Sequence, residues 1–296
     1  MIDNCRLCPR YCGVNRYKGE LGYCNCGNNI KIARYSLHMW EEPCISGTLG
    51  SGTIFFSNCN LRCVYCQNYD ISINGKGQEV SIEEFSDICI ELQNNGANNI
   101  NLVTATMYIP YIVKGLKNAR KRGLHIPIVY NSSGYESIEG LRLLDGIVDI
   151  YLTDFKYYDN ELASKYSGVN DYMEYSVKAL EEMFKQVGKN KFNKEGMMTK
   201  GIIVRHLVLP GCCNDSKRII KYLYNIYKND IYFSIMNQYT PVRKIGIDFL
   251  DRCVTNDEYD EVIDYAYNLG IRNAFVQEGE TQKESFIPDF DVFKAI

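Results

Sequence analysis

The chain lacks the features that would indicate a membrane or a nucleic-acid function. No apolar run approaches the roughly 18 residues that a membrane helix needs. The formal net charge of −3 gives no basic footprint for nucleic acid or for an anionic membrane surface. The first residues, MIDNCRLCPRYCG, lack the apolar core of a signal peptide. We therefore expect a cytoplasmic protein with no nucleic-acid partner and no membrane contact.

Tryptophan and histidine are also scarce, whereas cysteine is abundant. The 296 residues include one Trp and three His but 13 Cys and 24 Tyr. Because thiols stay reduced in the cytosol, clustered cysteines there indicate metal binding or redox chemistry rather than disulfides. Five cysteines lie in the first 26 residues, and three more lie within residues 59–66.

From residue 52 onward, short apolar segments alternate with longer amphipathic segments. The predicted strands are residues 52–57, 99–104, 126–131, 148–155, 202–209 and 231–236. Six β-then-α repeats with nearly continuous apolar strands predict a parallel sheet. We predict an α/β fold, a partial (β/α)6 barrel of parallel strands, because a closed barrel needs eight such units. Periodicity alone leaves a doubly wound open sheet as the alternative.

The first 51 residues differ from the rest in composition. They are rich in Cys, Gly and Asn and show little periodicity. Such a segment buries too little apolar surface to fold unaided, so we expect a metal to hold it together. We predict a cysteine-rich amino-terminal segment over residues 1–51, followed by the barrel and a C-terminal tail over residues 52–296.

Three cysteines in SNCNLRCVYCQNY, residues 57–69, follow the first predicted strand of the barrel. Cys59, Cys63 and Cys66 are one short of the four ligands that zinc and ordinary iron–sulfur clusters take. Three thiolates can ligate three irons of a [4Fe–4S] cube and leave the fourth iron open for a small molecule. A structural zinc site or a chance spacing is the alternative interpretation.

The stretch CNLRCVYC, with Tyr65 before the third cysteine, resembles the radical S-adenosylmethionine (SAM) superfamily. The resemblance implies that the amino and carboxylate groups of SAM chelate the open iron. It also implies that the reduced cluster splits SAM to a 5′-deoxyadenosyl radical, which abstracts hydrogen from a substrate. The missing ligand would then be the cosubstrate itself.

Segments at other strand ends resemble pyruvate formate-lyase activating enzymes. In TDFKYYDNELASKYSGVND, residues 153–171, the resemblance places Asp154 on the SAM ribose and Lys156 near the charged end of SAM. In VRHLVLPG, residues 204–211, it places Arg205 on the SAM carboxylate, which a guanidinium grips in two bonds. In NSSGY, residues 131–135, it places Asn131 and Ser133 near SAM.

Two segments depart from that family. Where the superfamily has a GGE-like stretch for the methionine amino group, this chain has Thr104, Ala105 and Thr106. We expect hydroxyl and carbonyl groups of Thr104 and Thr106 to take that role. Before the cysteines, HMWEEPCISGTLGSGTIFF, residues 38–56, replaces a DGPG-like stretch and resembles a less characterised related branch. We expect its first residues to line the substrate opening, to form a docking surface or to be a solvated loop.

The amino-terminal cysteines form a second cluster in the sequence. Cys5, Cys8 and Cys12 are followed by Cys24 and Cys26. This spacing is compatible with a zinc ion or with a second iron–sulfur cluster. Either would be bound by Cys5, Cys8 and Cys12 together with Cys24 or Cys26. Free thiols are the third possibility.

Three functions follow from these patterns. The first is an activating-enzyme-like radical SAM enzyme that acts on a glycyl residue of a partner enzyme, with a flavodoxin- or ferredoxin-type electron donor. The second is a radical SAM enzyme that modifies a small molecule or another protein side chain. The third is a zinc-binding scaffold or nucleic-acid adaptor, which the negative net charge disfavours.

Overall fold

A single sheet forms the centre of the computed structural model, which describes residues 2–247, 249–277 and 288–295. The strand order is β10-β9-β8-β6-β5-β4-β2-β1-β11, with β3 paired to β1 and β7 paired to β8. The strands are β1 (Ile30–His38), β2 (Ser51–Phe56), β3 (Gln78–Val80), β4 (Ile100–Val103), β5 (Ile128–Ser132), β6 (Ile150–Asp154), β7 (Lys191–Phe192), β8 (Met198–Leu207), β9 (Tyr232–Met236), β10 (Ala274–Val276) and β11 (Lys294–Ala295).

The six strands predicted from the sequence are β2, β4, β5, β6, β8 and β9. Neighbours in this series pair in parallel, and β10 adds a further parallel strand beside β9 that the sequence did not reveal. The two ends of the series do not pair with each other, so the sheet stays open. The α/β class and the partial barrel are therefore confirmed.

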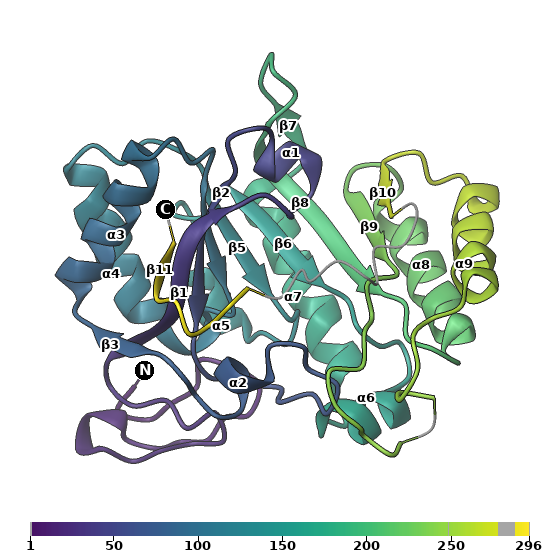
Figure 1. Ribbon diagram of the computed structural model, residues 1–296, viewed down its shortest axis with the longest axis horizontal. Helices are drawn as coiled ribbons and strands as arrows, with labels where there is room; N and C mark the ends of the chain where they lie inside the picture. The colour runs from purple at the N-terminus through teal and green to yellow at the C-terminus, as the bar shows by residue number, and fades with distance from the viewer. Residues whose placement is uncertain (1, 248, 278–287, 296) are drawn as a thin grey trace.

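Helices connect the parallel strands, as the amphipathic segments predict. They are α1 (Pro43–Ser46), α2 (Tyr69–Ser72), α3 (Ile82–Asn94), α4 (Ile109–Lys121), α5 (Ile138–Arg142), α6 (Asn160–Ser167), α7 (Tyr172–Val187), α8 (Cys213–Tyr227) and α9 (Asn256–Leu269), with 3-10 turns at Arg16–Lys18 and Thr106–Tyr108. Ser81 and Glu84 form a reciprocal capping box that starts α3. Figure 1 shows α3 and α4 together at the left, beside the end of the sheet that holds β1, and α8 and α9 together at the right, beside the end that holds β10.

The sheet extends across the boundary that the sequence predicts at residue 51. Strand β1, inside the amino-terminal segment, pairs antiparallel with β2, and β11 pairs in parallel with β1. The ring of Phe293 lies 5.4 Å from that of Tyr35, and Phe290 lies 5.6 Å from Phe55. Strands from the amino-terminal segment and from the last described residues therefore both extend the sheet beside β2. Residues 278–287 of the predicted C-terminal tail lie outside the described residues.

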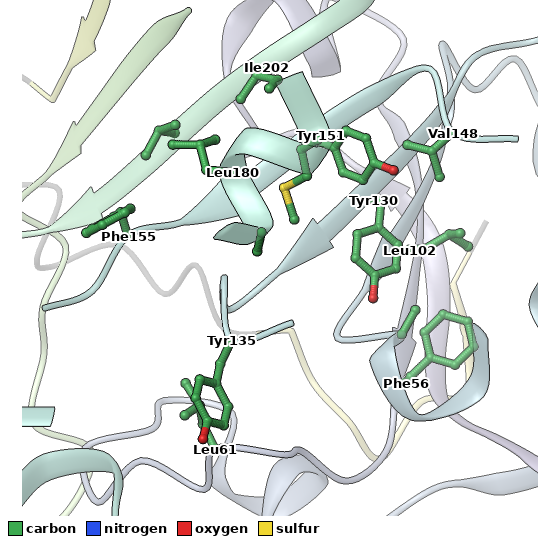
Figure 2. Packing of buried hydrophobic residues seen from close by; sticks show 14 of the residues in the cluster. Phe56, Leu61, Leu102, Tyr130, Tyr135, Val148, Tyr151, Phe155, Leu180 and Ile202 are labelled. Atoms are coloured by element: carbon green, nitrogen blue, oxygen red, sulfur yellow. The ribbon is translucent and has the colours of Figure 1, made fainter. Parts of the chain in front are cut away.

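The core between the sheet and the helices contains many tyrosines. Tyr130 and Tyr151 stand on neighbouring strands with ring centroids 6.0 Å apart (Figure 2). The Tyr151 hydroxyl donates to Gln186 at 2.5 Å, so this ring is buried with its polar end satisfied. Among the described helices, none is both long enough and apolar enough to cross a membrane.

Candidate active site

A cavity of about 240 Å³ lies where the parallel strands end at their carboxyl ends. This is the face on which βα barrels carry their chemistry. The cavity collects residues that lie far apart in the sequence. Those predicted from the sequence that line it are Cys59, Cys63, Tyr65, Cys66, Thr104, Asn131, Ser133, Asp154, Lys156 and Arg205.

The loop after β2 carries the three cysteines in a tightly curled backbone. Asn58 and Arg62 adopt left-handed conformations, with φ of 69° and 62°. The Asn58 amide donates to the Ile71 carbonyl at 2.7 Å, and the Val64 amide donates to the Tyr166 carbonyl at 2.8 Å. These bonds fasten the loop on both sides of Cys59 and Cys63.

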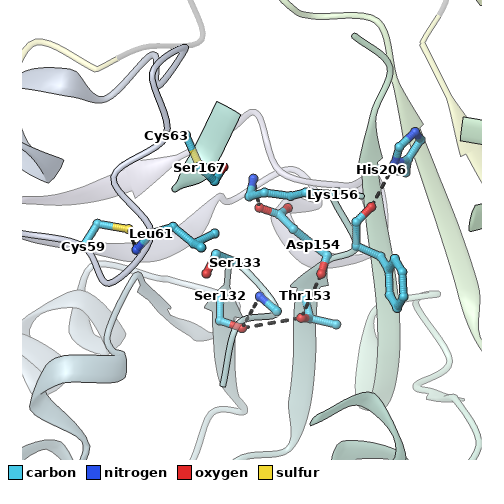
Figure 3. Close-up of polar contacts among 12 residues, drawn as sticks. Cys59, Leu61, Cys63, Ser132, Ser133, Thr153, Asp154, Lys156, Ser167 and His206 are labelled. Carbon is cyan, nitrogen blue, oxygen red and sulfur yellow. Dashed lines mark hydrogen bonds and ion pairs between the residues drawn. The ribbon is translucent and has the colours of Figure 1, made fainter. Parts of the chain in front are cut away.

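Hydroxyl and amide groups donate hydrogen bonds to the sulfur atoms. Ser167 donates to Cys63 Sγ at 2.9 Å and Ser72 donates to Cys66 Sγ at 3.2 Å, while the Leu61 amide lies 3.4 Å from Cys59 Sγ. Figure 3 shows Ser167 beside Cys63. Such donors tune iron–sulfur clusters. Ser72 and Ser167 come from α2 and α6, and no motif in the sequence links them to the cysteines.

The donor set fits a cluster better than a single ion. Burial raises the pKa of Cys59 to about 12 and also raises that of Cys66, so a positive group is needed to stabilise their thiolates. A single zinc ion is usually held by four protein ligands, and this loop supplies three thiols. The three thiols instead border a cavity, as ligands of separate irons in a cube would.

Asp154 and Lys156 form an ion pair on the opposite wall, with Nζ 2.6 Å from Oδ2 (Figure 3). Burial alone would lower the pKa of Lys156, but Asp154 and Cys63 hold it well above its usual range. The ammonium group is thus charged and lies in the field of both the carboxylate and the cysteine loop.

Two further polar residues line the cavity directly after β4 and β5. Ser133 Oγ is buried and has no hydrogen-bond partner among the described residues, which marks it as a group that a ligand can satisfy. Thr104 has a φ of 60°, a strained conformation for a β-branched residue, and its amide donates to the Asn131 carbonyl at 2.8 Å. The strand end that replaces the GGE-like stretch is therefore held in a fixed shape.

Thr106 does not reach this cavity, contrary to the expectation from the sequence. It begins the 3-10 turn after β4 and its hydroxyl donates to the buried Glu136 at 2.6 Å. Burial raises the pKa of Glu136 to about 8 despite its hydroxyl partners. Thr106 therefore belongs to a buried polar group with Glu136 and does not line the cavity.

Arg205 has two carboxylate partners that the sequence did not predict. Its Nε and Nη2 donate to Glu42, each at 2.7 Å, and Nη2 also pairs with Glu41. Of the two glutamates only Glu41 lines the cavity, where the Asn101 amide also donates to it at 2.8 Å. The cavity therefore presents a positive and a negative group side by side.

The mouth of the cavity includes residues from the segment that replaces the DGPG-like stretch. His38 and Trp40 line it, and Trp40 is 58% exposed. His206, the neighbour of Arg205, points away, as strand alternation predicts. Its ring lies between the Phe155 carbonyl and Ser216 Oγ, at 2.8 Å from each.

Four of the amino-terminal cysteines line a second, smaller cavity. They are Cys5, Cys8, Cys12 and Cys24, together with Arg16. Cys26 does not line this cavity, although its thiol lies beside Cys24: it is 3.7 Å from the Cys24 carbonyl and 3.5 Å from the Tyr108 hydroxyl. Of the two members of the CxC pair, the structure thus places only Cys24 on the cavity wall, a distinction that spacing alone did not make.

A parallel half-barrel that gathers three thiols and charged strand ends around one cavity is the arrangement expected of an iron–sulfur protein. The sequence model of the radical SAM superfamily matches residues 53–211. The chain belongs to that superfamily. Membership implies a [4Fe–4S] cluster and SAM as cofactors.

Two relatives extend the comparison in sequence. An uncharacterized protein of Methanocaldococcus jannaschii is 32% identical over 287 residues, which is 92% of this chain and 77% of that protein. The pyruvate formate-lyase-activating enzyme of Clostridium pasteurianum is 25% identical over 181 residues, which is 60% of this chain and 68% of that enzyme.

Solved structures show the same fold. SuiB of Streptococcus suis, bound to its precursor peptide SuiA, superposes with a TM-score of 0.53 at 13% identity, covering 76% of this chain and 47% of SuiB. HydG, a maturase of the [FeFe]-hydrogenase, gives a TM-score of 0.53 at 13% identity, covering 80% of this chain and 54% of HydG. The chain thus spans about half the length of each of these proteins.

Proposed function

We propose that Cys59, Cys63 and Cys66 hold a [4Fe–4S] cluster and that the enzyme cleaves SAM reductively in the adjoining cavity. The single observation that carries this proposal is the convergence of these thiols with Ser133, Asp154 and Arg205 on one cavity. When bound, the cluster supplies the electron that divides SAM into methionine and a 5′-deoxyadenosyl radical, which takes a hydrogen atom from the substrate.

Each polar group has a matching part of SAM. Asp154 accepts hydrogen bonds from the ribose hydroxyls, and Lys156 keeps its carboxylate in place through the 2.6 Å ion pair. Ser133 Oγ, which lacks a partner among the described residues, gains one from the cosubstrate. Asn131 and Tyr65 complete the wall.

The adjacent Arg205 and Glu41 match the zwitterionic end of SAM. Arg205 donates to the α-carboxylate, and Glu41 accepts from the α-ammonium group. Glu41 then supplies the carboxylate that the strand end at Thr104 lacks. Glu42 keeps Arg205 oriented through its two hydrogen bonds.

The proposed substrate is a glycyl residue of a partner enzyme, with the reducing electron delivered by a flavodoxin- or ferredoxin-type protein. Similarity to two pyruvate formate-lyase-activating enzymes, at 25% and 23% identity, supports this choice. The exposed Trp40 at the cavity mouth also supports it, because exposed tryptophans beside a site are typical anchors for a protein partner.

The cleavage step is tested by 5′-deoxyadenosine release. Anaerobically reconstituted enzyme with dithionite and SAM should release it, and Cys63→Ala should not, because two thiolates are left for the exposed cluster. Cys89→Ala is the matched control, since Cys89 is buried in α3. Release by the Cys63→Ala variant at the rate of the parent would overturn the ligand assignment.

The substrate is tested separately with candidate glycyl radical enzymes grown on [2-²H]glycine. Transfer of one deuterium into 5′-deoxyadenosine, with a protein-centred radical signal in electron paramagnetic resonance (EPR), is the expected result. Release of unlabelled 5′-deoxyadenosine without that signal would rule out those proteins and leave a small molecule or another side chain as the hydrogen source.

A further inference from the structure

The amino-terminal residues fold without regular elements of their own. From residue 2 to residue 29 the only helical element described is the 3-10 turn Arg16–Lys18. The apolar residues buried there are few, namely Ile2, Leu7, Pro9 and Cys26. Segments this poor in core usually depend on a metal or another staple.

Within this segment, four thiols surround one small space. The cavity lined by Cys5, Cys8, Cys12 and Cys24 measures about 20 Å³, against about 240 Å³ for the cavity beside Cys59. A space of that size matches one atom or water molecule rather than a cube of eight atoms. The thiols border it without converging to ligand distances, so an ion would draw them inward.

The wall of the same cavity contains a buried cation. Arg16 is 1% exposed, and its guanidinium donates to the carbonyls of Gly27 and of Met107. Among the described residues, no carboxylate forms an ion pair with it. A buried charge without an opposite partner is costly, and an ion held by four thiolates carries the net negative charge that would offset it.

We propose that Cys5, Cys8, Cys12 and Cys24 bind one structural Zn²⁺ ion, with Arg16 as its buried counter-charge. The site is closed, because four thiolates complete the tetrahedral coordination of zinc. It is separate from the [4Fe–4S] cluster of the proposed function and does not depend on it.

This zinc would also brace the loop that carries the cluster cysteines. Arg10, between two of the ligands, donates through Nε to the Asn60 carbonyl at 3.0 Å. Its guanidinium lies 3.7 Å from the ring centroid of Tyr23, whose hydroxyl donates to the Leu61 carbonyl at 3.3 Å. The zinc therefore holds in place two side chains that fix the loop between Cys59 and Cys63.

Metal analysis of a variant in which Cys59, Cys63 and Cys66 are all Ser tests the proposal. This full-length variant should retain one zinc per chain and no iron. Adding Cys8→Ser should remove the zinc, whereas adding Cys26→Ser should not, because Cys26 lies outside the cavity. Iron in place of zinc would establish a second cluster and overturn the proposal, as would loss of zinc with Cys26→Ser.

A spectroscopic measurement covers the case in which Cys8→Ser fails to fold. Cobalt(II) exchanged into the triple-serine variant should give the intense visible bands of tetrahedral thiolate coordination. Absence of these bands from folded protein would overturn the proposal. Failure of the proposed function is recognised separately, as a wild-type EPR signal that does not change on adding SAM.

Discussion

Replacing Glu42 by Gln should weaken the fold markedly, although Glu42 does not line the cavity. The Glu42 side chain is 5% exposed and accepts two hydrogen bonds of 2.7 Å from Arg205. Removing one partner of a buried ion pair costs roughly 3–5 kcal/mol. Because Gln keeps an acceptor oxygen and Arg205 keeps Glu41, we expect a loss of about 3 kcal/mol in the free energy of unfolding.

The pH dependence of this loss has a definite sign. Burial alone would raise the pKa of Glu42, but Arg205 holds it below its usual range. A carboxyl group whose pKa is lower in the folded state stabilises the fold above its unfolded pKa, roughly 4.3. That contribution disappears as the pH falls through the folded pKa, so the difference between Glu42→Gln and the parent should be largest near neutral pH.

Equilibrium unfolding in urea, under anaerobic conditions and with the same metal content in every variant, measures the effect. The control is Glu261→Gln, because Glu261 is 51% exposed and pairs with Lys217 on the surface. We expect this control to change stability by at most about 1 kcal/mol. A Glu42→Gln loss no larger than that of the control would refute the reasoning that the Arg205 pair is buried and coupled.

Three further changes probe the site and its supports. Ser167→Ala removes the 2.9 Å donor to Cys63 and should lower the cluster potential in an EPR-monitored redox titration, whereas Ser86→Ala, whose hydroxyl donates to the Gly115 carbonyl, should not. Arg205→Lys replaces the planar guanidinium by an ammonium group that cannot form two parallel hydrogen bonds to a carboxylate. Because a hydrogen bond to a charged group is worth roughly 1.5–3 kcal/mol, the SAM dissociation constant should rise about tenfold or more. An unchanged constant contradicts the assignment. Burial lowers the pKa of His206 to about 4 in the folded state, whereas the pKa in the unfolded state is about 6.5. As the pH falls from 6.5 to 4, His206 is therefore protonated in the unfolded state first, and the free energy of unfolding should fall by up to about 3 kcal/mol. In His206→Gln that dependence should shrink when urea midpoints are compared across this pH range, and an identical profile would contradict it.

The parallel strands were predictable because burial on both faces leaves a simple signal. Strands β2, β4, β5, β6, β8 and β9 are short apolar runs, each followed by an amphipathic segment. Strand β1 was missed because its sequence, IKIARYSLH, mixes charged and apolar residues, and its pairing with β2 and β11 is a long-range property. Strand β10 is three residues long, too short to give a periodic signal.

The site residues likewise divide into those that a local motif predicts and those that come from distant segments of the chain. Motif spacing placed Cys59, Cys63 and Cys66 around one cavity because three ligands in a short loop have few alternatives. The sequence does not reveal the partners of Arg205 and Cys63. Glu42, which binds Arg205, and Ser167, which donates a hydrogen bond to Cys63, each lie more than 100 positions from that partner. Thr106 was misplaced because the chain turns after Ala105 and buries its hydroxyl group against Glu136.

The pairing of β11 with β1 has a consequence for how the enzyme is made. Pro288 lines the cavity. The strand that follows it, β11, pairs with β1 at the edge of the sheet, next to β2. During synthesis the cysteine loop leaves the ribosome long before β11 does, so the cavity beside the loop stays incomplete until residues 288–295 have been made. The cysteines of the cluster loop therefore lie beside an incomplete cavity for as long as the chain between them and β11 is being made, and the site is complete only once β11 has joined β1.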